Sequence, residues 1–121
     1  MSLIFAYQSR GVTKDLTVLD ALGNVITPGS NDKLRVIIGR EGQLGIDLAD
    51  AELVVTSDAA TVNGSSLTIG GGNDGRHRLR LDASDLAFPP GVYTFFFDYL
   101  DVADQTEWKN IDRQVFNLEE S

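Results

Sequence analysis

Residues 86–100, which read LAFPPGVYTFFFDYL, constrain the fold of this chain more than any other stretch. After Leu86-Ala87 comes Phe88-Pro89-Pro90-Gly91, a turn signal in which proline presets φ and glycine accepts a positive φ. A run of mostly apolar strand formers follows. Its period of two places four aromatic rings on one face: Tyr93, Phe95, Phe97 and Tyr99. Such a face would aggregate if it were exposed, so we expect this strand in the middle of a core, with the tyrosine hydroxyls at its rim bonded to the backbone.

Shorter strand signals, separated by turn signals, recur along the chain. We expect strands at residues 3–7, 15–19, 33–38, 51–56, 67–69, 76–81 and 106–118. A hairpin-type turn is expected at 20–24 and a glycine-rich turn at 70–75. Residues 82–87 are the one helical candidate, a single turn capped by Asp82 or Ser84. The pattern predicts an all-β, antiparallel immunoglobulin-like β-sandwich of about seven to nine strands with at most one short helical turn.

The last strand carries a change of parity. Trp108 and Ile111 fall on opposite faces of a regular strand, and so do Ile111 and Phe116. One extra residue in the middle would restore a common inward face. We therefore predict a β-bulge in this strand.

Length and composition limit the classes of protein that the chain can belong to. A chain of 121 residues is long enough for one domain, 1–121, with a modest core. There is no cysteine, which excludes disulfides, thiol catalysis and cysteine-based zinc sites. The net charge of −8 disfavours nucleic acid and anionic membranes as partners. The sequence shows neither a secretory signal nor an apolar run that could span a bilayer, so we expect no membrane insertion.

Four stretches carry a resemblance to a known family. They are YQSRGVTK at 7–14, VLDALGNVI at 18–26, RLRLDASDL at 78–86, and PPGVY at 89–93 with the hairpin and the final strand that follow it. Together they resemble the small immunoglobulin-like domains of tailed-phage virion proteins, typified by the N-terminal domain of the baseplate upper protein family. The resemblance extends over nearly the whole chain. It implies a non-enzymatic structural protein of a phage or prophage particle, located in the virion or in the host cytoplasm before assembly.

Several residues are candidates for contact with a protein partner, which would be another virion component or a second copy of the chain. Trp108 is either an exposed contact residue or a cap on one end of the core, and Tyr99 lies near it across the hairpin. The outward-facing apolar side chains of Ile37 and Phe96, with Val92 and Leu100, could form the interface of a homo-oligomer.

A basic stripe is the second candidate contact. Arg76, Arg78 and Arg80 alternate with inward-facing residues and share one face of a strand. They could bind an acidic patch on a neighbouring subunit. They could equally form cross-strand pairs with the chain's own carboxylates, which are abundant.

The sequence offers no credible catalytic set, and we expect no enzyme activity and no cofactor. His77 is the only histidine and reads as an inward neighbour of Leu79, while Ser65-Ser66 lacks a Gly-x-Ser-x-Gly elbow. Two groups of acidic residues could offer oxygens to Ca²⁺ but are also ordinary for an acidic surface: Asp98, Asp101, Asp104 and Glu107, and Asp47, Asp50 and Glu52. We expect no metal site.

The residues alone are also consistent with a second function. Trp108 and Tyr99, if exposed near acidic residues, would suit the stacking of a sugar ring. The alternative to an assembly protein is therefore a carbohydrate- or surface-binding β-sandwich module.

Overall fold

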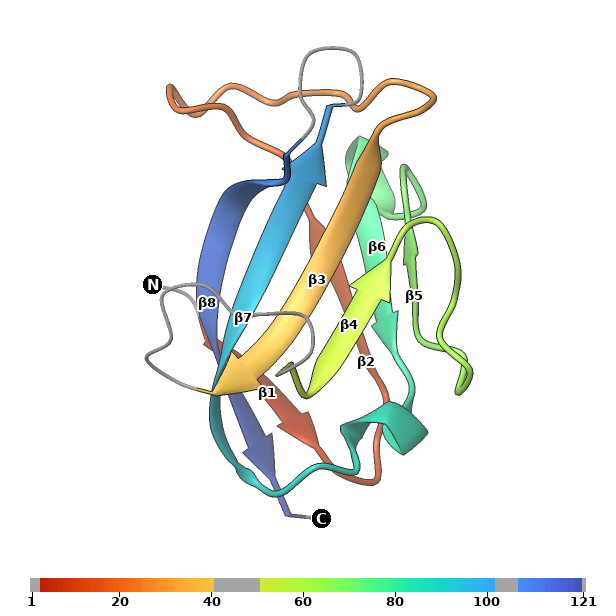
Figure 1. Ribbon diagram of the computed structural model, residues 1–121, viewed down its shortest axis with the longest axis vertical. Coiled ribbons are helices and arrows are strands. Elements are labelled where there is room, and N and C mark those ends of the chain that lie inside the picture. The colour runs from red at the N-terminus through yellow and green to blue at the C-terminus, as the bar shows by residue number, and fades with distance from the viewer. Residues whose placement is uncertain (1–2, 41–50, 102–106, 121) are drawn as a thin grey trace.

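The computed structural model describes residues 3–40, 51–101 and 107–120. Within them the chain forms eight strands in two facing sheets (Figure 1). The larger sheet contains, in spatial order, β1 (Leu3–Tyr7), β8 (Lys109–Glu119), β7 (Gly91–Leu100), β3 (Lys33–Arg40) and β4 (Leu53–Thr56). The smaller sheet contains β2 (Val12–Leu16), β6 (His77–Leu81) and β5 (Ser66–Thr68). The predicted all-β sandwich is confirmed.

The division of strands between the sheets is that of immunoglobulin-like domains. β2, β6 and β5 take the places of strands B, E and D, and β3, β7 and β8 take those of C, F and G. Near the start of β7, the Tyr93 hydroxyl donates a hydrogen bond to the backbone oxygen of Pro89. This tyrosine corner is typical of such sandwiches, and it is a backbone partner of the kind predicted for the rim hydroxyls.

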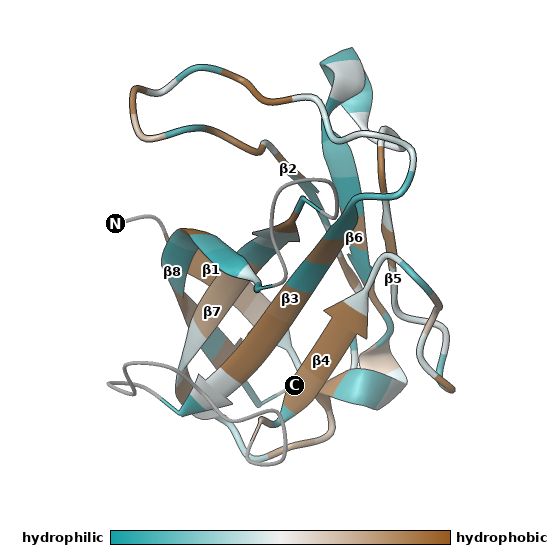
Figure 2. Cartoon of the chain, turned by 45° about the horizontal axis from the view of Figure 1, so that its top comes forward, coloured by the Kyte–Doolittle hydropathy of each residue, from teal (hydrophilic) through white to brown (hydrophobic). Residues whose placement is uncertain are grey.

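The aromatic face of β7 lies in the core, as predicted. None of its four rings is more than 8% exposed: Tyr93, Phe95, Phe97 and Tyr99. Across the sheet they adjoin inward-facing residues of β3, and Phe95 stacks against Phe116 of β8 at 6.5 Å between ring centroids. Figure 2 shows β4 and most of β3 as hydrophobic along their length. Removal of this apolar surface from water is the main force that holds the sheets together.

One strand pair departs from the predicted antiparallel arrangement. β1 and β8 run parallel, with Leu3 opposite Val115 and Tyr7 opposite Glu119. Side chains alternate in the same way in either direction, so the pattern that predicted β1 could not give its direction. β1 thereby becomes an edge of the larger sheet, whereas β2, which follows it in sequence, enters the smaller one.

The predicted bulge in the last strand is confirmed, and its extra residue is Ile111, but the expected common inward face is wrong, because the bulge leaves Trp108 on the outer face with Asn110. Asp98 pairs with Asn110, but the preceding residue, Phe97, pairs with Asp112. Beyond the bulge, the alternate residues of β8 are buried on the inner face: Gln114, Phe116 and Leu118.

Other strand boundaries shift only slightly from the prediction. β2 occupies Val12–Leu16 instead of 15–19, although Leu16 and Val18 are both buried as expected. β4 begins at Leu53 instead of residue 51. Residues 41–50, with Asp47 and Asp50, lie outside the described residues.

The described residues contain two single turns of 3₁₀ helix, one more than predicted. The expected turn is η3 (Ala83–Leu86), where the Asp82 carboxylate caps the turn by accepting the Ser84 N–H at 2.9 Å. The unexpected one is η2 (Asn73–Gly75) in the glycine-rich connection. The Asp15 carboxylate of β2 accepts the Asn73 N–H at 3.1 Å and ties this turn to the sheet. Neither turn is long enough to span a membrane, and the described residues hold no helix that is.

Candidate functional site

Two regions of the surface stand out, the strand β1 and one end of the sandwich. β1 presents its odd-numbered residues on the outer face of the larger sheet, the face that points away from the smaller sheet. Leu3 is 48% exposed, Phe5 57% and Tyr7 44%, whereas Ile4 and Ala6 between them are buried in the core. We call these three residues and Val92 of β7, which is 43% exposed, the β1 patch. Phe5 and Val92 lie in one row of the sheet, because both pair with Asn117.

The open edge of β1 lacks the features that usually protect an edge strand. Natural edge strands carry lysines, prolines or inward-pointing charges that prevent another strand from pairing with them. β2, an edge of the smaller sheet, has such a charge, since Lys14 lies opposite Leu79 on the core-facing row. β1 reads LIFAY and contains neither a charge nor a proline. An exposed apolar edge of this kind marks either a contact surface or an aggregation site.

The centre of the outer face is apolar but covered. Ile37 and Phe96 do point outward and lie opposite each other on β3 and β7. They are only 4% and 5% exposed, so they offer little surface to a partner, contrary to the expectation for an oligomer interface. The Arg113 guanidinium lies over the Phe96 ring at 5.0 Å, which covers part of this apolar surface with a charged group.

Trp108 lies on the same outer face and does not cap the core. Its ring is half-buried, and the Arg35 guanidinium stacks on it at 4.3 Å. Arg35 also donates two hydrogen bonds, of 3.0 and 2.9 Å, to one oxygen of Asp98, while Asn110 donates to the other at 3.0 Å. The Asp98 side chain is 8% exposed and that of Arg35 15%. The cluster joins β3 and β7 to the start of β8.

Tyr99, the predicted neighbour of Trp108, faces the core. It is 6% exposed, and its hydroxyl donates to Asp32 at 2.7 Å. The two residues are therefore on opposite faces of the sheet. The paired aromatic platform for a sugar ring, expected on the alternative hypothesis, does not form.

The three arginines of the basic stripe have different surroundings in the structure. Arg78 forms an ion pair with Asp15 of β2 at 3.1 Å, which is the cross-strand pairing considered from the sequence. The hydrogen bond from Arg78, followed by that from the Asn73 backbone, lowers the pKa of Asp15. Arg76 lies just before β6, and both Arg76 and Arg80 are exposed. Figure 2 shows the resulting hydrophilic surface along β6.

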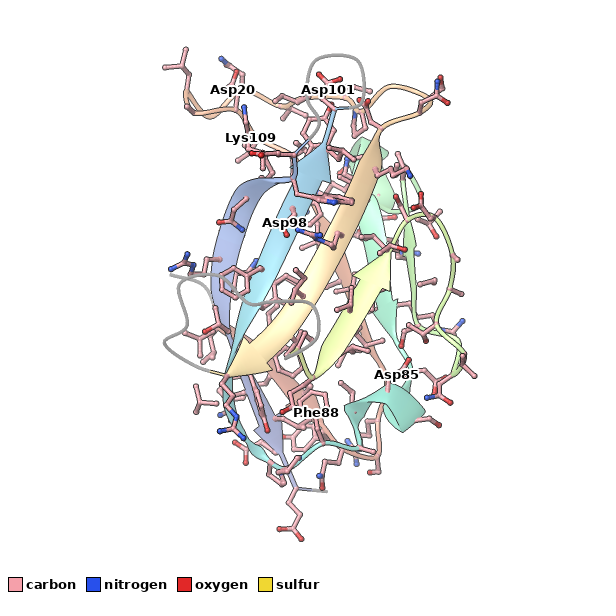
Figure 3. All side chains as sticks on the ribbon, in the orientation of Figure 1. Asp20, Asp85, Phe88, Asp98, Asp101 and Lys109 are labelled. Atoms are coloured by element: carbon pink, nitrogen blue, oxygen red, sulfur yellow. The ribbon has the colours of Figure 1, made fainter. Side chains whose placement is uncertain are left out.

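The second region is the end of the sandwich where β7 ends and β8 begins. Figure 3 shows Asp20, Asp101 and Lys109 gathered there, and Asp85 and Phe88 at the opposite end. A pocket of about 450 Å³ opens at this end, lined by Leu19, Asp20, Ala21, Ile26, Tyr99, Asp101, Lys109, Asn110 and Ile111. In immunoglobulin-like domains the loops at one end of the sandwich often bind ligands, so this pocket is a candidate by analogy of fold.

The hairpin that borders this pocket is rigidly built. Asp20 accepts hydrogen bonds from the backbone N–H groups of Leu22 and Asn24, both at 2.9 Å, and Gly23 supplies the positive φ of +85° that the turn requires. The Asn24 backbone, the first of several donors, lowers the pKa of Asp20. The Asp20 carboxylate is thus occupied by the turn, while Leu22 at its tip is 87% exposed.

His77 lies on the other side of the same hairpin, beside a second pocket of about 400 Å³. It is 4% exposed and neighbours Leu79, as predicted. Its Nδ1 accepts the Gly70 N–H at 3.0 Å, which requires the neutral ring. Burial lowers the pKa of His77 and favours the same form.

Ser65 takes part in a structural network. Its buried hydroxyl donates to Asp85 and accepts the Asp82 N–H at 2.8 Å. Thr61 donates to the same Asp85 oxygen at 2.6 Å, and Asn63 to the other at 2.9 Å. Burial acts to raise the pKa of Asp85, but these hydrogen bonds outweigh it and lower the pKa. The network fastens the connection before β5 to η3.

The two acidic groups lie only partly within the described residues. The oxygens of Asp98 bind Arg35 and Asn110, and Asp104 lies outside the described residues together with Asp47 and Asp50. Across the described ranges no group of three or more histidine, aspartate or glutamate side chains is placed to hold an ion.

No protein-family model matches the sequence, and no curated protein matches it.

The sequence reasoning missed the three β1 residues of the β1 patch, whereas Val92 was among the predicted outward-facing apolar residues. Leu3, Phe5 and Tyr7 alternate with Ile4 and Ala6, and both sets are apolar, so the pattern could not say which set faces water. The absence of a charge or proline in the strand was the available signal, but it has meaning only once β1 is known to be an edge.

Proposed function

We propose that this chain is a non-enzymatic assembly protein of a phage or prophage virion that acts through protein–protein contacts. The observation that carries the proposal is the β1 patch, an exposed apolar strand at an unprotected sheet edge. A net charge of −8 keeps most of the surface solvated, although single apolar side chains such as Leu22 and Val62 are also exposed. In β1, three exposed apolar side chains lie together on an edge strand without charge or proline, an arrangement that favours a covering partner. The resemblance of four stretches to domains of tailed-phage virion proteins supports a phage or prophage virion as the particle.

The buried networks argue in the same direction. His77, Ser65 and Asp85, the side chains that could have suggested hydrolytic chemistry, are committed to backbone and loop contacts that hold the fold. In the described part of the chain they are not brought into a common pocket: His77 lines the loop end, and Asp85 lies at the opposite end (Figure 3).

Size-exclusion chromatography with multi-angle light scattering tests the assembly role. At physiological salt, the weight-average mass of the protein should rise with concentration towards a multiple of the monomer mass. A monomer at every concentration up to the millimolar range would contradict self-assembly and would favour the alternative function.

The alternative is a carbohydrate- or surface-binding module, and the pocket of about 450 Å³ at the loop end favours it. Lys109 and Asn110 of β8 line this pocket together with apolar residues of the hairpin. A glycan array would test it, with Lys109→Ala as the matched variant. Glycan binding by the unmodified chain that is lost in Lys109→Ala would support the binding-module hypothesis. No binding above background by the unmodified chain would rule that hypothesis out.

A further inference from the structure

We propose that two copies of this chain associate through β1, by antiparallel pairing of the two β1 strands about a two-fold axis at Phe5. The inference rests on the proposed assembly role and names the partner, which is a second copy of the same chain. The larger sheet would then continue from one copy into the other as a single sheet.

Within the described residues, the backbone of β1 has a row of groups on its open side that pair with no other strand, although the turn after β1 uses one of them: the Arg10 N–H donates to the Tyr7 oxygen at 3.1 Å. The Gln8 N–H donates to the Glu119 oxygen of β8 at 3.1 Å. N–H directions alternate along a strand, so those of Ile4 and Ala6 also point to β8, and those of Leu3, Phe5 and Tyr7 point to the open edge. β1 is therefore ready to accept one more strand on that side.

One antiparallel register uses all three of these residues. With Phe5 on the axis, Phe5 faces Phe5 of the second copy, and Leu3 faces Tyr7 of the second copy. Each of these is a hydrogen-bonded pair of an antiparallel ladder, because the N–H and C=O groups of these residues point outward across the edge. The Tyr7 oxygen already accepts the Arg10 N–H, so the ladder is complete at Phe5 and relies at its ends on the Tyr7 N–H and the Leu3 oxygen. The outer face then gains an aromatic pair flanked by two aliphatic–aromatic pairs, which are favourable cross-strand neighbours. On the inner face, Ile4 faces Ala6.

The self-complementary register favours a second copy as the occupant. The net charge of −8 on each chain opposes the approach of two copies, but β1 adds no charge of its own to the contact. A partner that recognises charged side chains would find no charged side chain on β1. A contact of five residues on each side is small compared with a permanent interface, so we expect a dimer in reversible equilibrium, with a dissociation constant in roughly the micromolar range.

Cysteine cross-linking tests the register, because the chain has no cysteine of its own. Cα atoms of a hydrogen-bonded antiparallel pair are about 5.5 Å apart, within the range that a disulfide spans. Phe5→Cys should therefore form a covalent dimer under mild oxidation, at least tenfold faster than Val62→Cys. Val62 is fully exposed but lies before β5, far from β1 in sequence.

A mixed experiment fixes the direction. Leu3→Cys and Tyr7→Cys chains should cross-link to each other, while each alone should cross-link slowly, because its two thiols would be about 14 Å apart along the strands. A Leu3→Cys chain that cross-links to itself as fast as to Tyr7→Cys would overturn the antiparallel register.

The outcomes separate the two proposals. If light scattering shows association but Phe5→Cys cross-links no faster than Val62→Cys, the β1 dimer is wrong and the assembly role stands on another surface. If the unmodified chain does not associate at any concentration, both self-assembly and the β1 dimer are wrong. Circular dichroism of each variant confirms that it retains the fold.

Discussion

At the scale of single residues, the outer face of the larger sheet depends on one buried charge pair. Asp98 is held by Arg35 and Asn110, and Trp108 covers the guanidinium that neutralises it. The sequence showed an aspartate in an apolar strand but gave no sign of its partner, since Arg35 precedes it by 63 residues. A buried carboxylate without a cation is strongly unfavourable, so these residues should behave as one unit.

Arg35→Met should lower the free energy of unfolding by about 3 kcal/mol, because it leaves Asp98 buried without its cation. Adding Asp98→Leu to it should recover at least half of that loss. Urea unfolding followed by tryptophan fluorescence measures both. Arg80→Met, at an exposed site, is the control and should change stability by less than about 0.5 kcal/mol. A double variant no more stable than Arg35→Met would contradict the coupling of Arg35 to Asp98.

His77 should make the stability depend on pH below neutrality. Burial holds its pKa below the ordinary histidine value of about 6.5, so the unfolded chain binds the proton more readily than the folded one. Its contribution is therefore complete above about pH 6.5, and the free energy of unfolding falls as the pH drops below that value, by at most about 1.4 kcal/mol per pH unit.

Urea unfolding at pH 7.5 and 5.5 measures this effect, with His77→Gln as the matched variant. Most carboxylates keep their charge in that window, so the variant should show a smaller difference between the two pH values. Equal differences in the two proteins would mean that His77 is not the titrating group.

At the scale of elements, most of the architecture follows from alternation and turn signals. The aromatic face of β7, the inward-facing residues of β3 and the bulge in β8 could all be predicted from the sequence. Burial of one face of a strand determines which alternate residues must be apolar. Neither the parallel direction of β1 nor the burial of Ile37 and Phe96 on the outer face could be predicted from the sequence, because both depend on which segments become neighbours in space. Trp108 illustrates the same limit: its parity changes at the bulge, and its contact is with a distant arginine.

The corner at the start of β7 joins the turn at 88–91 to the strand. Tyr93→Phe removes the hydroxyl that bonds the Pro89 oxygen and should lower the free energy of unfolding by about 1 kcal/mol. Tyr7→Phe, on a ring that is 44% exposed, is the control and should change it by a few tenths at most. Equal effects on the urea midpoint in the two variants would show that the corner hydrogen bond adds nothing.

At the scale of the whole molecule, the two sheets carry different surfaces. The smaller sheet presents alternating arginines with a carboxylate partner, while the larger one ends in two uncharged strands, β1 and β4, of which β1 exposes three large apolar side chains. This asymmetry is visible only in the fold, because the strand order determines which apolar segments lie at a sheet edge (Figure 1). We expect the β1 edge to decide whether the protein is found alone or in an assembly.

Sedimentation velocity over a hundredfold range of concentration tests the assembly role most directly. It would compare the unmodified chain with Phe5→Lys, which puts a charge at the centre of the β1 patch, and with Leu22→Lys, a matched change at the exposed tip of the hairpin. We predict that the unmodified chain and Leu22→Lys associate to the same extent, and that Phe5→Lys remains a monomer throughout. Association of Phe5→Lys equal to that of the unmodified chain, or a monomeric unmodified chain at every concentration, would contradict assembly through β1.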